Sequence, residues 1–222
     1  MKKIWITAIL SGDMFNFWMN LKYENISAIV LAGGESKRIG RNKALLKVNN
    51  KTIIEIVLNK LKNLFTNILI STNNNTEYSF LRYSTINDIL KNHGPLSGIH
   101  SGLAHSNTQK NFFISCDMPL IDEHSISYIV ENSNNAEITI PIVENYPIYV
   151  CGVYSKNILN EIEKMIGEQP QKASIKNLTK KVETKYLDIK LQSFFNEINY
   201  LNMNTNQDYE IVKNILKSES NE

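Results

Sequence analysis

A short apolar run that stops at a pair of glycines is the feature that most constrains the fold. Residues Ile26 to Ala32 are almost all apolar and are followed directly by Gly33 and Gly34. A run of this length, with little alternation between apolar and polar positions, is typical of a strand buried on both faces. Strands of this kind belong to parallel sheets covered by helices, so the run predicts an α/β protein.

Helical and strand patterns alternate along the first half of the chain. Thr52 and Glu55 form a capping-box pattern before a broad apolar face, which predicts a helix from about Thr52 to Phe65. Pro95 suits the first turn of another helix. Strands are expected at Asn67 to Thr72, Ser84 to Asn87 and Asn111 to Cys116, with Asp122 capping a further helix.

The alternation loosens in the second half, where strand patterns at 137–143 and 148–154 follow each other directly. Consecutive strands predict an antiparallel or mixed part of the sheet. Helices are then expected at 156–165 and 173–178, strands at 183–189 and 197–201, and a last helix capped by Thr205 and Asp208. The expected fold is Rossmann-like, a three-layer αβα arrangement around a mostly parallel mixed sheet, with ligands beyond the carboxyl ends of the strands.

Composition narrows the classes of protein that fit. The 222 residues, 42% of them hydrophobic, suffice for one sizeable core, and 24 basic against 22 acidic side chains leave a formal charge of +2. This balance argues against a nucleic-acid partner or an anionic membrane surface, so any anion site must be local. Cys116 and Cys151 lie in apolar runs without metal-site spacing, and a reducing cytoplasm is the expected location.

The first residues imitate a short signal peptide, because Lys2 and Lys3 precede the apolar run Ile4 to Leu10. We reject that interpretation, since the run is at the lower limit of length, no cleavage site follows and Asp13 interrupts. A membrane span needs about 20 apolar residues and is also excluded. We expect residues 1–25 to be an N-terminal extension and residues 26–222 to form a single domain.

The segment after the first strand has the composition of a phosphate-binding loop. Gly33 and Gly34 allow a tight turn that brings backbone N–H groups close to an anion, and Lys37, Arg38 and Lys43 add positive charge. Neither the P-loop ending nor the dinucleotide fingerprint is present. A turn with solvated cations explains the spacing equally well, so the segment alone supports only a hypothesis.

Two aspartates follow predicted strands at the same edge of the sheet. Asp117 directly follows a buried strand, where a carboxylate can hold Mg²⁺ against substrate phosphates. The alternative is that Asp117 only opens a turn before Pro119. Asp88 allows the same two interpretations, a carboxylate of the site or a simple loop residue.

A helix start lies near that edge in the segment Gly94-Pro95-Leu96-Ser97-Gly98. Free N–H groups at a helix N-terminus favour an anion or a polar base edge, although ordinary capping would explain the segment too. His93, His100 and His105 lack the spacing of a metal site, and we expect them to lie on the surface.

These motifs form an ordered set that also includes Leu-Asn-Met-Asn-Thr from Leu201. The preceding members are Leu-Ala-Gly-Gly-x-Ser-x-Arg-Ile-Gly-x-x-Lys from Leu31, Asn87-Asp88, Gly-Pro-Leu-x-Gly-Ile from Gly94, and Cys-Asp-x-Pro from Cys116. The set closely resembles the molybdenum cofactor guanylyltransferase family, from Ile26 to about Leu216. Many nucleotidyltransferases share the first motif, whereas the full order is more specific. The resemblance implies the glycosyltransferase-A-like nucleotidyltransferase fold.

The resemblance also implies roles for matching residues. Lys43 would bind the phosphates of GTP with help from Arg38, and Asp117 would coordinate Mg²⁺ and nucleotide; these three are the expected catalytic residues. Ser71 would line the guanine pocket, whereas Asn202 and Asn204 would lie near the pterin. The residues expected to contact substrates are Leu31, Ala32, Gly33, Gly34, Lys43, Ser71, Asp88, Gly94, Pro95, Leu96, Gly98, Asp117, Asn202 and Asn204.

The implied reaction transfers GMP from GTP to molybdenum-bearing molybdopterin, releasing pyrophosphate and forming the guanine dinucleotide cofactor. Mg²⁺ is the implied cofactor, and molybdenum-insertion proteins and apo-molybdoenzymes or their chaperones are implied partners. The alternatives are a molybdopterin cytidylyltransferase, a sugar- or polyol-phosphate nucleotidyltransferase of the same fold, and a non-catalytic cofactor-delivery protein.

The chain departs from the family pattern in three places. Asn42 replaces the aspartate that usually precedes the lysine, and Ser71 replaces an asparagine that is common in the family. The first 25 residues have no counterpart. Because the position of Ser71 bears on the choice of base, guanine specificity depends on that residue and its neighbours.

Overall fold

A computed structural model describes residues 23–33 and 42–219. Within this part of the chain, eight strands form one sheet and two more form a hairpin. The strands of the sheet are β1 (Ile26–Leu31), β4 (Ile68–Ser71), β5 (Ser84–Ile86), β6 (Lys110–Ser115), β7 (Ile138–Val143), β8 (Tyr146–Pro147), β9 (Cys151–Ser155) and β10 (Thr184–Asp188). They run in the order β10-β7-β9-β6-β1-β4-β5, with β8 paired to β7.

The sheet is mostly parallel and mixed, as predicted. Strand β1 pairs in parallel with both β4 and β6, β4 with β5, and β7 with β10. Strand β9 is antiparallel to β6 and β7, which confirms the mixed second half. The chain adds β4 and β5 on one side of β1 and then returns to add β6 on the other. This reversal of direction beside β1 creates the crevice where α/β sheets bind ligands.

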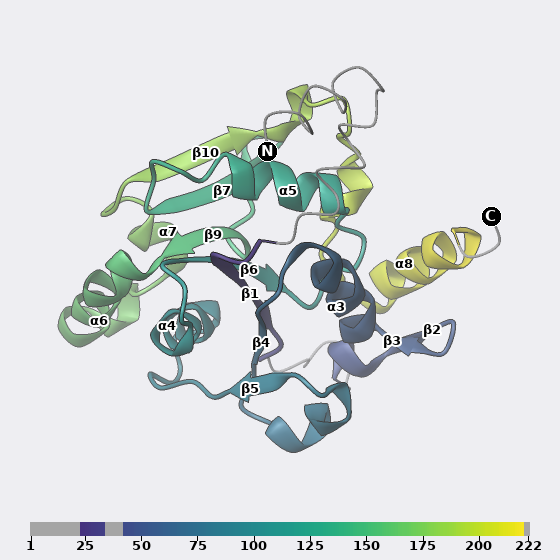
Figure 1. Cartoon of the computed structure of the whole chain (residues 1–222), viewed down its shortest axis with the longest axis horizontal. Helices are drawn as coiled ribbons and strands as arrows, with labels where there is room; N and C mark the ends of the chain where they lie inside the picture. Colours follow the sequence, from purple (N-terminus) through teal and green to yellow (C-terminus); the bar gives the residue numbers. More distant parts are fainter. Residues whose placement is uncertain (1–22, 34–41, 220–222) are drawn as a thin grey trace, which may run out of the picture.

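Helices cover both faces of the sheet and make the predicted three layers (Figure 1). The helices covering the sheet are α3 (Ile53–Leu64), α4 (Pro95–His105), α5 (Glu123–Glu131), α6 (Leu159–Glu168) and α7 (Ile175–Leu178), and a further helix is α8 (Asn206–Ser218). Short 3₁₀ turns are η1 (Lys43–Leu45), η2 (Asn75–Leu81), η3 (Lys156–Ile158), η4 (Pro170–Lys172), η5 (Ile189–Leu191) and η6 (Glu197–Tyr200). Among the described residues, no helix is both long enough and apolar enough to cross a membrane.

The two faces of β1 bury alternate side chains in different cores. Ala28 and Val30 belong to the core that contains apolar residues of α3 and α5. Ile29 and Leu31 belong to the other core, with residues of α4, α6 and α7. Side chains alternate across a strand, so a strand covered on both faces needs a continuous apolar run. The apolar run Ile26 to Ala32 therefore lies at the centre of the molecule.

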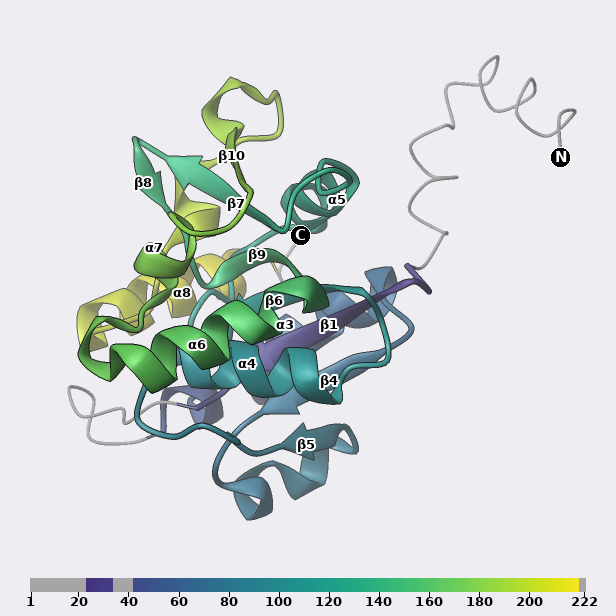
Figure 2. The same cartoon turned by 90° about the vertical axis from the view of Figure 1, so that its left-hand side faces the viewer.

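A third apolar cluster fixes the end of the chain beside the strand ends. It unites Val48 of the hairpin β2 (Lys47–Val48) and β3 (Lys51–Thr52) with Met203 and with Val212 of α8. Figure 2 shows β1 running toward the side of the molecule on which α8 lies. The segment before α8 is consequently held where the nucleotide site was expected.

Two capping boxes confirm predicted helix starts. Thr52 and Glu55 cap α3, and Thr205 and Asp208 cap α8, with the side chain and backbone bonds of both boxes formed. The predicted strand at 197–201 is wrong, because 197–200 form the 3₁₀ turn η6. The Asn196 side chain starts this turn by accepting a bond from the N–H of Ile198 (3.3 Å).

The expectation that His100 lies on the surface is also wrong. Its side chain is 3% exposed, and its Nε2 lies 3.1 Å from Oε1 of Glu163 on α6. The sequence of α4 shows that His100 follows the apolar Ile99, but it does not show that α6 covers this side of the helix. Burial of His100 therefore results from packing between α4 and α6.

Two helical glycines provide a matched test of this packing. A Cβ atom on Gly102 of α4 would come within 2.5 Å of the buried Phe113 ring, whereas one on Gly167 of α6 would meet nothing within 4 Å. We expect Gly102→Ala to lower the free energy of unfolding by about 1–3 kcal/mol through overpacking. Gly167→Ala should raise it by about 0.5 kcal/mol through helix propensity. Urea denaturation of both variants checks this; equal effects would contradict the close contact.

Candidate active site

Four parallel strands end at one edge of the sheet, and the predicted motifs follow their ends. Backbone hydrogen bonds continue the pairing past the strands. The N–H of Ala32 donates to the carbonyl oxygen of Ser71 (2.8 Å), and the N–H of Cys116 donates to the carbonyl oxygen of Leu31 (3.1 Å). The glycine-rich segment, the end of β4 and the Cys116-Asp117 segment are therefore brought together beside β1, as the sequence predicted.

Lys43 connects this edge to the end of the chain. It begins η1, and its Nζ donates a hydrogen bond of 2.9 Å to Oδ1 of Asn204. The two residues are 161 positions apart, so the sequence contains no local signal for the contact. Gly34 and Arg38, which were also predicted for this site, lie outside the described residues.

Asp208 fixes Asn204 in place through the capping box of α8. Its carboxylate accepts bonds from the N–H groups of Asn204 (2.8 Å) and Thr205 (2.7 Å). Burial alone would raise the pKa of Asp208, but these bonds to the charged form outweigh burial, and the pKa lies below its usual value. The helix cap thus orients the partner of Lys43 as well as starting the helix.

Asp117 lies two residues beyond β6 and is tied to the same C-terminal segment. Its backbone carbonyl accepts a bond of 2.8 Å from the N–H of Met203. Its Oδ1 atom is buried without a hydrogen-bond partner, and the same is true of Oδ1 of Asn202. Buried oxygens are normally paired, so an unpaired carboxylate oxygen at this edge is suited to a cation or a ligand donor.

The neighbouring Cys116 is not an obvious nucleophile. Burial raises the pKa of its thiol, and the negative charge of Asp117 raises it further. The thiol is therefore protonated at neutral pH and packs as a small apolar group.

The start of α4 packs against the ends of β1 and β4. Gly94 has a φ of +56°, which favours glycine, and the turn leads into Pro95. A Cβ atom on Gly98 would lie 2.8 Å from Cδ2 of Leu31 and 3.0 Å from Oγ of Ser71. Gly98 is thus required for this close approach. Leu96 is fully buried and Ser71 is 2% exposed, so both lie below the surface at this edge of the sheet.

Asp88, which follows β5, is held by a side chain that follows the end of the neighbouring strand β4. The Asn73 amide donates to Oδ2 of Asp88 (2.7 Å) and accepts from the Asp88 backbone N–H (3.0 Å). This reciprocal pair fixes the carboxylate near the carboxyl end of β5. The expectation that Asp88 binds nucleotide remains a prediction.

A hollow of about 550 Å³ extends from Asn202 over the β7–β8 turn. Its apolar and aromatic lining includes Val143, Tyr146, Ile148, Ile198 and Tyr200. Asn196, Glu197 and Asn202 add polar side chains to this lining. The hollow therefore combines apolar walls with a few polar groups, which is the usual character of a small-molecule site.

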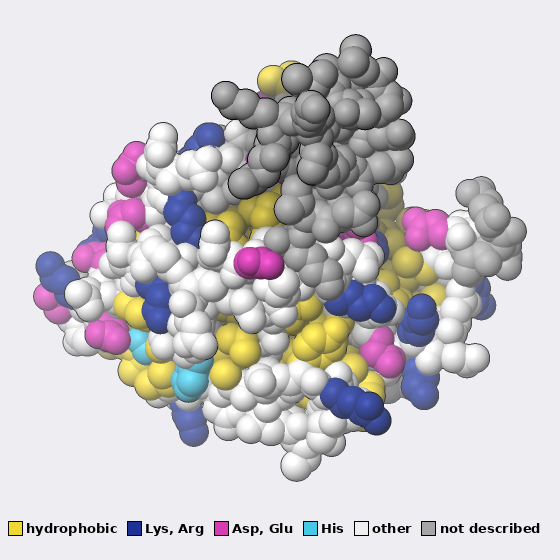
Figure 3. Space-filling view, viewed as in Figure 1, with side chains coloured by type: hydrophobic (Ala, Val, Ile, Leu, Met, Phe, Trp, Pro, Cys, Tyr) yellow, Lys and Arg dark blue, Asp and Glu magenta, His cyan; other side chains and the backbone are white. Residues whose placement is uncertain are grey.

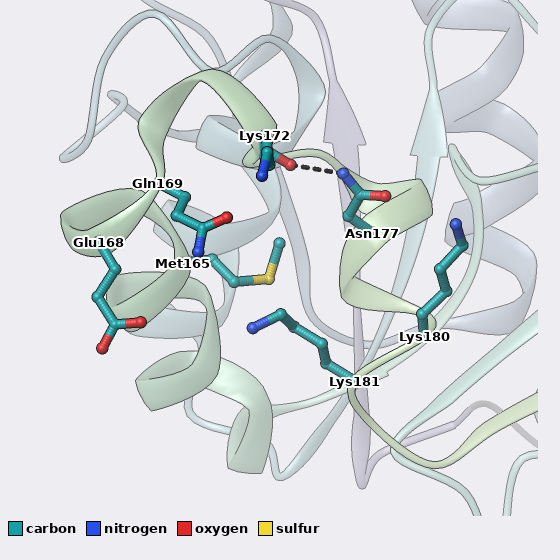
Figure 4. A pocket seen from close by; sticks show the side chains of 7 residues that line it. All are labelled: Met165, Glu168, Gln169, Lys172, Asn177, Lys180 and Lys181. Atoms are coloured by element: carbon teal, nitrogen blue, oxygen red, sulfur yellow. Dashed lines mark hydrogen bonds between the residues drawn. The ribbon is translucent and has the colours of Figure 1, made fainter.

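A smaller cavity of about 250 Å³ lies between α6, η4 and α7 (Figure 4). Its lining includes Met165 and the lysines Lys172, Lys180 and Lys181. Lys181 pairs with Glu161 at 3.0 Å. None of the residues predicted from sequence lines this cavity, and we do not assign it to the nucleotide site.

Charge over the surface is mixed rather than concentrated. In the face shown in Figure 3, Lys and Arg side chains of the described residues are dispersed among acidic and neutral ones. This distribution agrees with the near-neutral charge of the chain. Among the described residues, no group of three or more His, Cys, Asp or Glu side chains forms a metal cluster.

The family model described as "MobA-like NTP transferase domain" matches residues 28–183. The chain belongs to this family. Two curated relatives, each named "Probable molybdenum cofactor guanylyltransferase", come from Peptoclostridium acidaminophilum and Clostridium perfringens. The first is 31% identical over 87% of this chain and 90% of the relative, and the second is 33% identical over 83% and 94%.

A solved structure agrees on the fold. The "Molybdopterin-guanine dinucleotide biosynthesis protein A" of Archaeoglobus fulgidus superimposes with a TM-score of 0.75, covering 87% of this chain and all of that one. Its sequence identity is 23%. The predicted family resemblance and the nucleotidyltransferase fold are confirmed, and the protein is an enzyme of the nucleotidyltransferase class.

The capping box of α8 generates a test of how Asn204 is held. We expect Asp208→Ala to lower the free energy of unfolding by about 1 kcal/mol at neutral pH. Because the folded-state pKa of Asp208 is lowered, its contribution is present above the unfolded value near 4 and disappears as pH falls through the folded value. Urea denaturation at pH 7 and at acidic pH should show the difference between variant and parent shrinking; a constant difference would contradict the role of charge.

Proposed function

We propose that this protein transfers GMP from GTP to the molybdenum-bearing molybdopterin, forming the molybdopterin guanine dinucleotide cofactor and releasing pyrophosphate. The bond between Lys43 and Asn204 is the observation that carries the proposal. It joins the ammonium group of Lys43 to the C-terminal segment at the strand ends of a nucleotidyltransferase fold, which supports a role for both in binding substrate. The names of the relatives supply the identity of the substrates.

In the proposed reaction, a terminal phosphate oxygen of molybdopterin attacks the α-phosphorus of GTP. A new P–O bond forms there while the bond from the α-phosphorus to the bridging oxygen of the β-phosphate breaks. The bridging oxygen keeps the electron pair and leaves with pyrophosphate. No covalent enzyme intermediate is needed, so the protein acts by positioning the two phosphates and neutralising their charge.

Lys43 and the backbone at Leu31, Ala32 and Gly33 carry out most of this task in our proposal. The ammonium group of Lys43 binds triphosphate oxygens, and Asn204 holds the lysine in position before the nucleotide arrives. Gly34 and Arg38 are assigned to the triphosphate by the family resemblance. Asp88 and the segment Gly94 to Gly98 are assigned to the nucleoside side.

Asp117 is the residue suited to hold Mg²⁺. Its unpaired, buried Oδ1 is a hard oxygen ligand, and Mg²⁺ commonly uses one or two carboxylates together with waters and substrate phosphates. When bound, Mg²⁺ neutralises charge on the phosphates.

The hollow beside Asn202 is our proposed place for the acceptor. Its apolar and aromatic lining suits a flat heterocycle, and Asn202 at its edge supplies a polar side chain. Because Met203 is bonded to Asp117, this hollow adjoins the residue that faces the nucleotide phosphates. The acceptor and GTP would therefore meet at Asp117.

We further propose that residues 26–222 act as one domain in the cytoplasm. Molybdenum-insertion proteins would deliver the acceptor, and apo-molybdoenzymes or their chaperones would receive the product. A cytidylyltransferase and a sugar- or polyol-phosphate enzyme use related folds, but the curated relatives favour guanine and molybdenum cofactor. A cofactor-delivery protein without catalysis would bind GTP and release no pyrophosphate.

Loss of the Asp117 carboxylate provides the first test. We expect Asp117→Ala to reduce pyrophosphate release by at least about 100-fold, because charge on the phosphates is no longer neutralised. The measurement is coupled detection of pyrophosphate with GTP, Mg²⁺ and molybdenum-bearing molybdopterin. Glu210→Ala, which removes an exposed carboxylate of α8, is the matched control and should retain parental turnover.

Loss of the Lys43 ammonium provides the second test. We expect Lys43→Ala to lower kcat/KM for GTP by about 100-fold, since a charge contact with the triphosphate is lost. Lys47→Ala removes an exposed lysine of the nearby hairpin and serves as the control. Near-normal turnover by Lys43→Ala would contradict the assignment of this residue to the triphosphate.

Base choice is tested by supplying GTP and CTP in turn and identifying the dinucleotide product by mass spectrometry. We expect the guanine dinucleotide to dominate. A dominant cytosine product would replace the proposed activity with that of a cytidylyltransferase. Binding of GTP without magnesium-dependent pyrophosphate release would favour the delivery protein.

A further inference from the structure

We infer that Tyr78, Asn42 and Glu77 form a positioning unit that sets the spacing between Ala32 and Lys43 in the triphosphate site. We call these three residues the clasp. Glu77 and Tyr78 lie outside every motif of the predicted site, and η2, which carries both, has no counterpart in the elements expected from sequence, whereas Asn42 is the departure from the family pattern noted before Lys43. The inference rests on the proposed function, because it assigns residues that serve the same site.

Tyr78 connects both sides of the glycine-rich segment through one oxygen atom. Its hydroxyl donates to the carbonyl oxygen of Ala32 at 3.2 Å and accepts a bond of 2.9 Å from Nδ2 of Asn42. Ala32 directly follows β1, and Asn42 directly precedes Lys43. The hydroxyl therefore fixes the position at which the chain leaves the sheet relative to the position at which the lysine begins.

The tyrosine itself is firmly anchored. Its side chain is 1% exposed and belongs to the core cluster that also contains Ala32 and Ala44. Burial raises its pKa to about 12, so the hydroxyl remains protonated and able to donate at neutral pH. A donor held by the core is rigid, whereas one on a solvated side chain would be free to turn away.

Both polar atoms of the Asn42 side-chain amide form hydrogen bonds in the clasp. Its Nδ2 donates to the hydroxyl of Tyr78 and to Oε2 of Glu77 (2.6 Å), while its Oδ1 accepts from the N–H of Ala44 (3.1 Å) and caps η1. A carboxylate has no N–H groups and would lose both donated bonds. The amide at this position, unlike the aspartate expected from the family pattern, is therefore required by its neighbours.

Glu77 explains why the amide is needed. An aspartate at position 42 would place its carboxylate against that of Glu77, where the Asn42 nitrogen now lies within 2.6 Å. Two carboxylates at such a distance repel and cannot both stay ionised. Asn42 and Glu77 are thus a matched pair, in which the negative charge belongs to the partner on η2 instead of the residue before the lysine.

Removal of the hydroxyl oxygen of Tyr78 tests whether this residue holds the two ends of the segment in position. Tyr78→Phe keeps the buried ring and leaves the Ala32 carbonyl and the Asn42 amide short of one partner each. We expect kcat/KM for GTP to fall about tenfold, mainly through KM, because the triphosphate contacts are no longer held in register. Ser79→Ala removes a hydroxyl from the same 3₁₀ turn, one that bonds only to the Thr76 carbonyl among the described contacts, and should be neutral.

A rescue experiment separates positioning from simple destabilisation. Asn42→Asp alone should lower kcat/KM for GTP at least about tenfold through repulsion with Glu77. Combining it with Glu77→Gln removes the repulsion and restores the bond between positions 42 and 77 with the roles of donor and acceptor reversed, while the bond donated to Tyr78 stays lost, so we expect partial recovery. Relief of the repulsion would also restore folding, so an unchanged melting temperature of Asn42→Asp is what identifies the loss as one of positioning.

Thermal melting and GTP titration calorimetry accompany the kinetics for each variant. Parental kinetics in Tyr78→Phe, or no recovery in the Asn42→Asp, Glu77→Gln protein with melting temperatures unchanged, would overturn the clasp. Failure of the proposed function looks different: the parent protein itself would release no pyrophosphate from GTP. Calorimetry would then still report whether the clasp supports nucleotide binding.

Discussion

The hydrogen bond between Lys43 and Asn204 is the interaction on which the site depends. It closes the fold at the strand ends by joining η1 to the segment that precedes α8. Met203 reinforces the closure by bonding to Asp117 after β6. Three segments that are distant in sequence thus meet around the crevice beside β1, and the sheet order places that crevice where ligands bind in α/β proteins.

Much of the architecture could be predicted because local patterns are strong. The continuous apolar run of β1 indicated burial on both faces, and the pairs Thr52–Glu55 and Thr205–Asp208 indicated helix starts that formed as capping boxes. The strand expected at 197–201 failed because the Asn196 side chain offered the backbone a local partner and favoured a 3₁₀ turn. Apolar content alone does not distinguish a strand from a 3₁₀ turn.

The candidate site was predictable in its parts and not in its connections. The glycines, Lys43 and Asp117 could be recognised from motif order, but the contact of Lys43 with Asn204 depends on packing of Met203 and Val212 against the hairpin. The clasp could not be found from sequence either, since neither Tyr78 nor Glu77 belongs to a motif. Their roles arise because η2 lies against the residues that flank the glycine-rich segment.

The capping box of α8 performs two tasks with one carboxylate. Asp208 starts the helix and holds Asn204, which in turn contacts Lys43. Terminal helices open locally at a lower free-energy cost than central strands. Opening of the first turn of α8 would therefore loosen Asn204, a hydrogen-bond partner of Lys43, while the sheet stays folded. The stability of this helix start is thereby coupled to the geometry at the strand ends, and a stronger central core would not replace it.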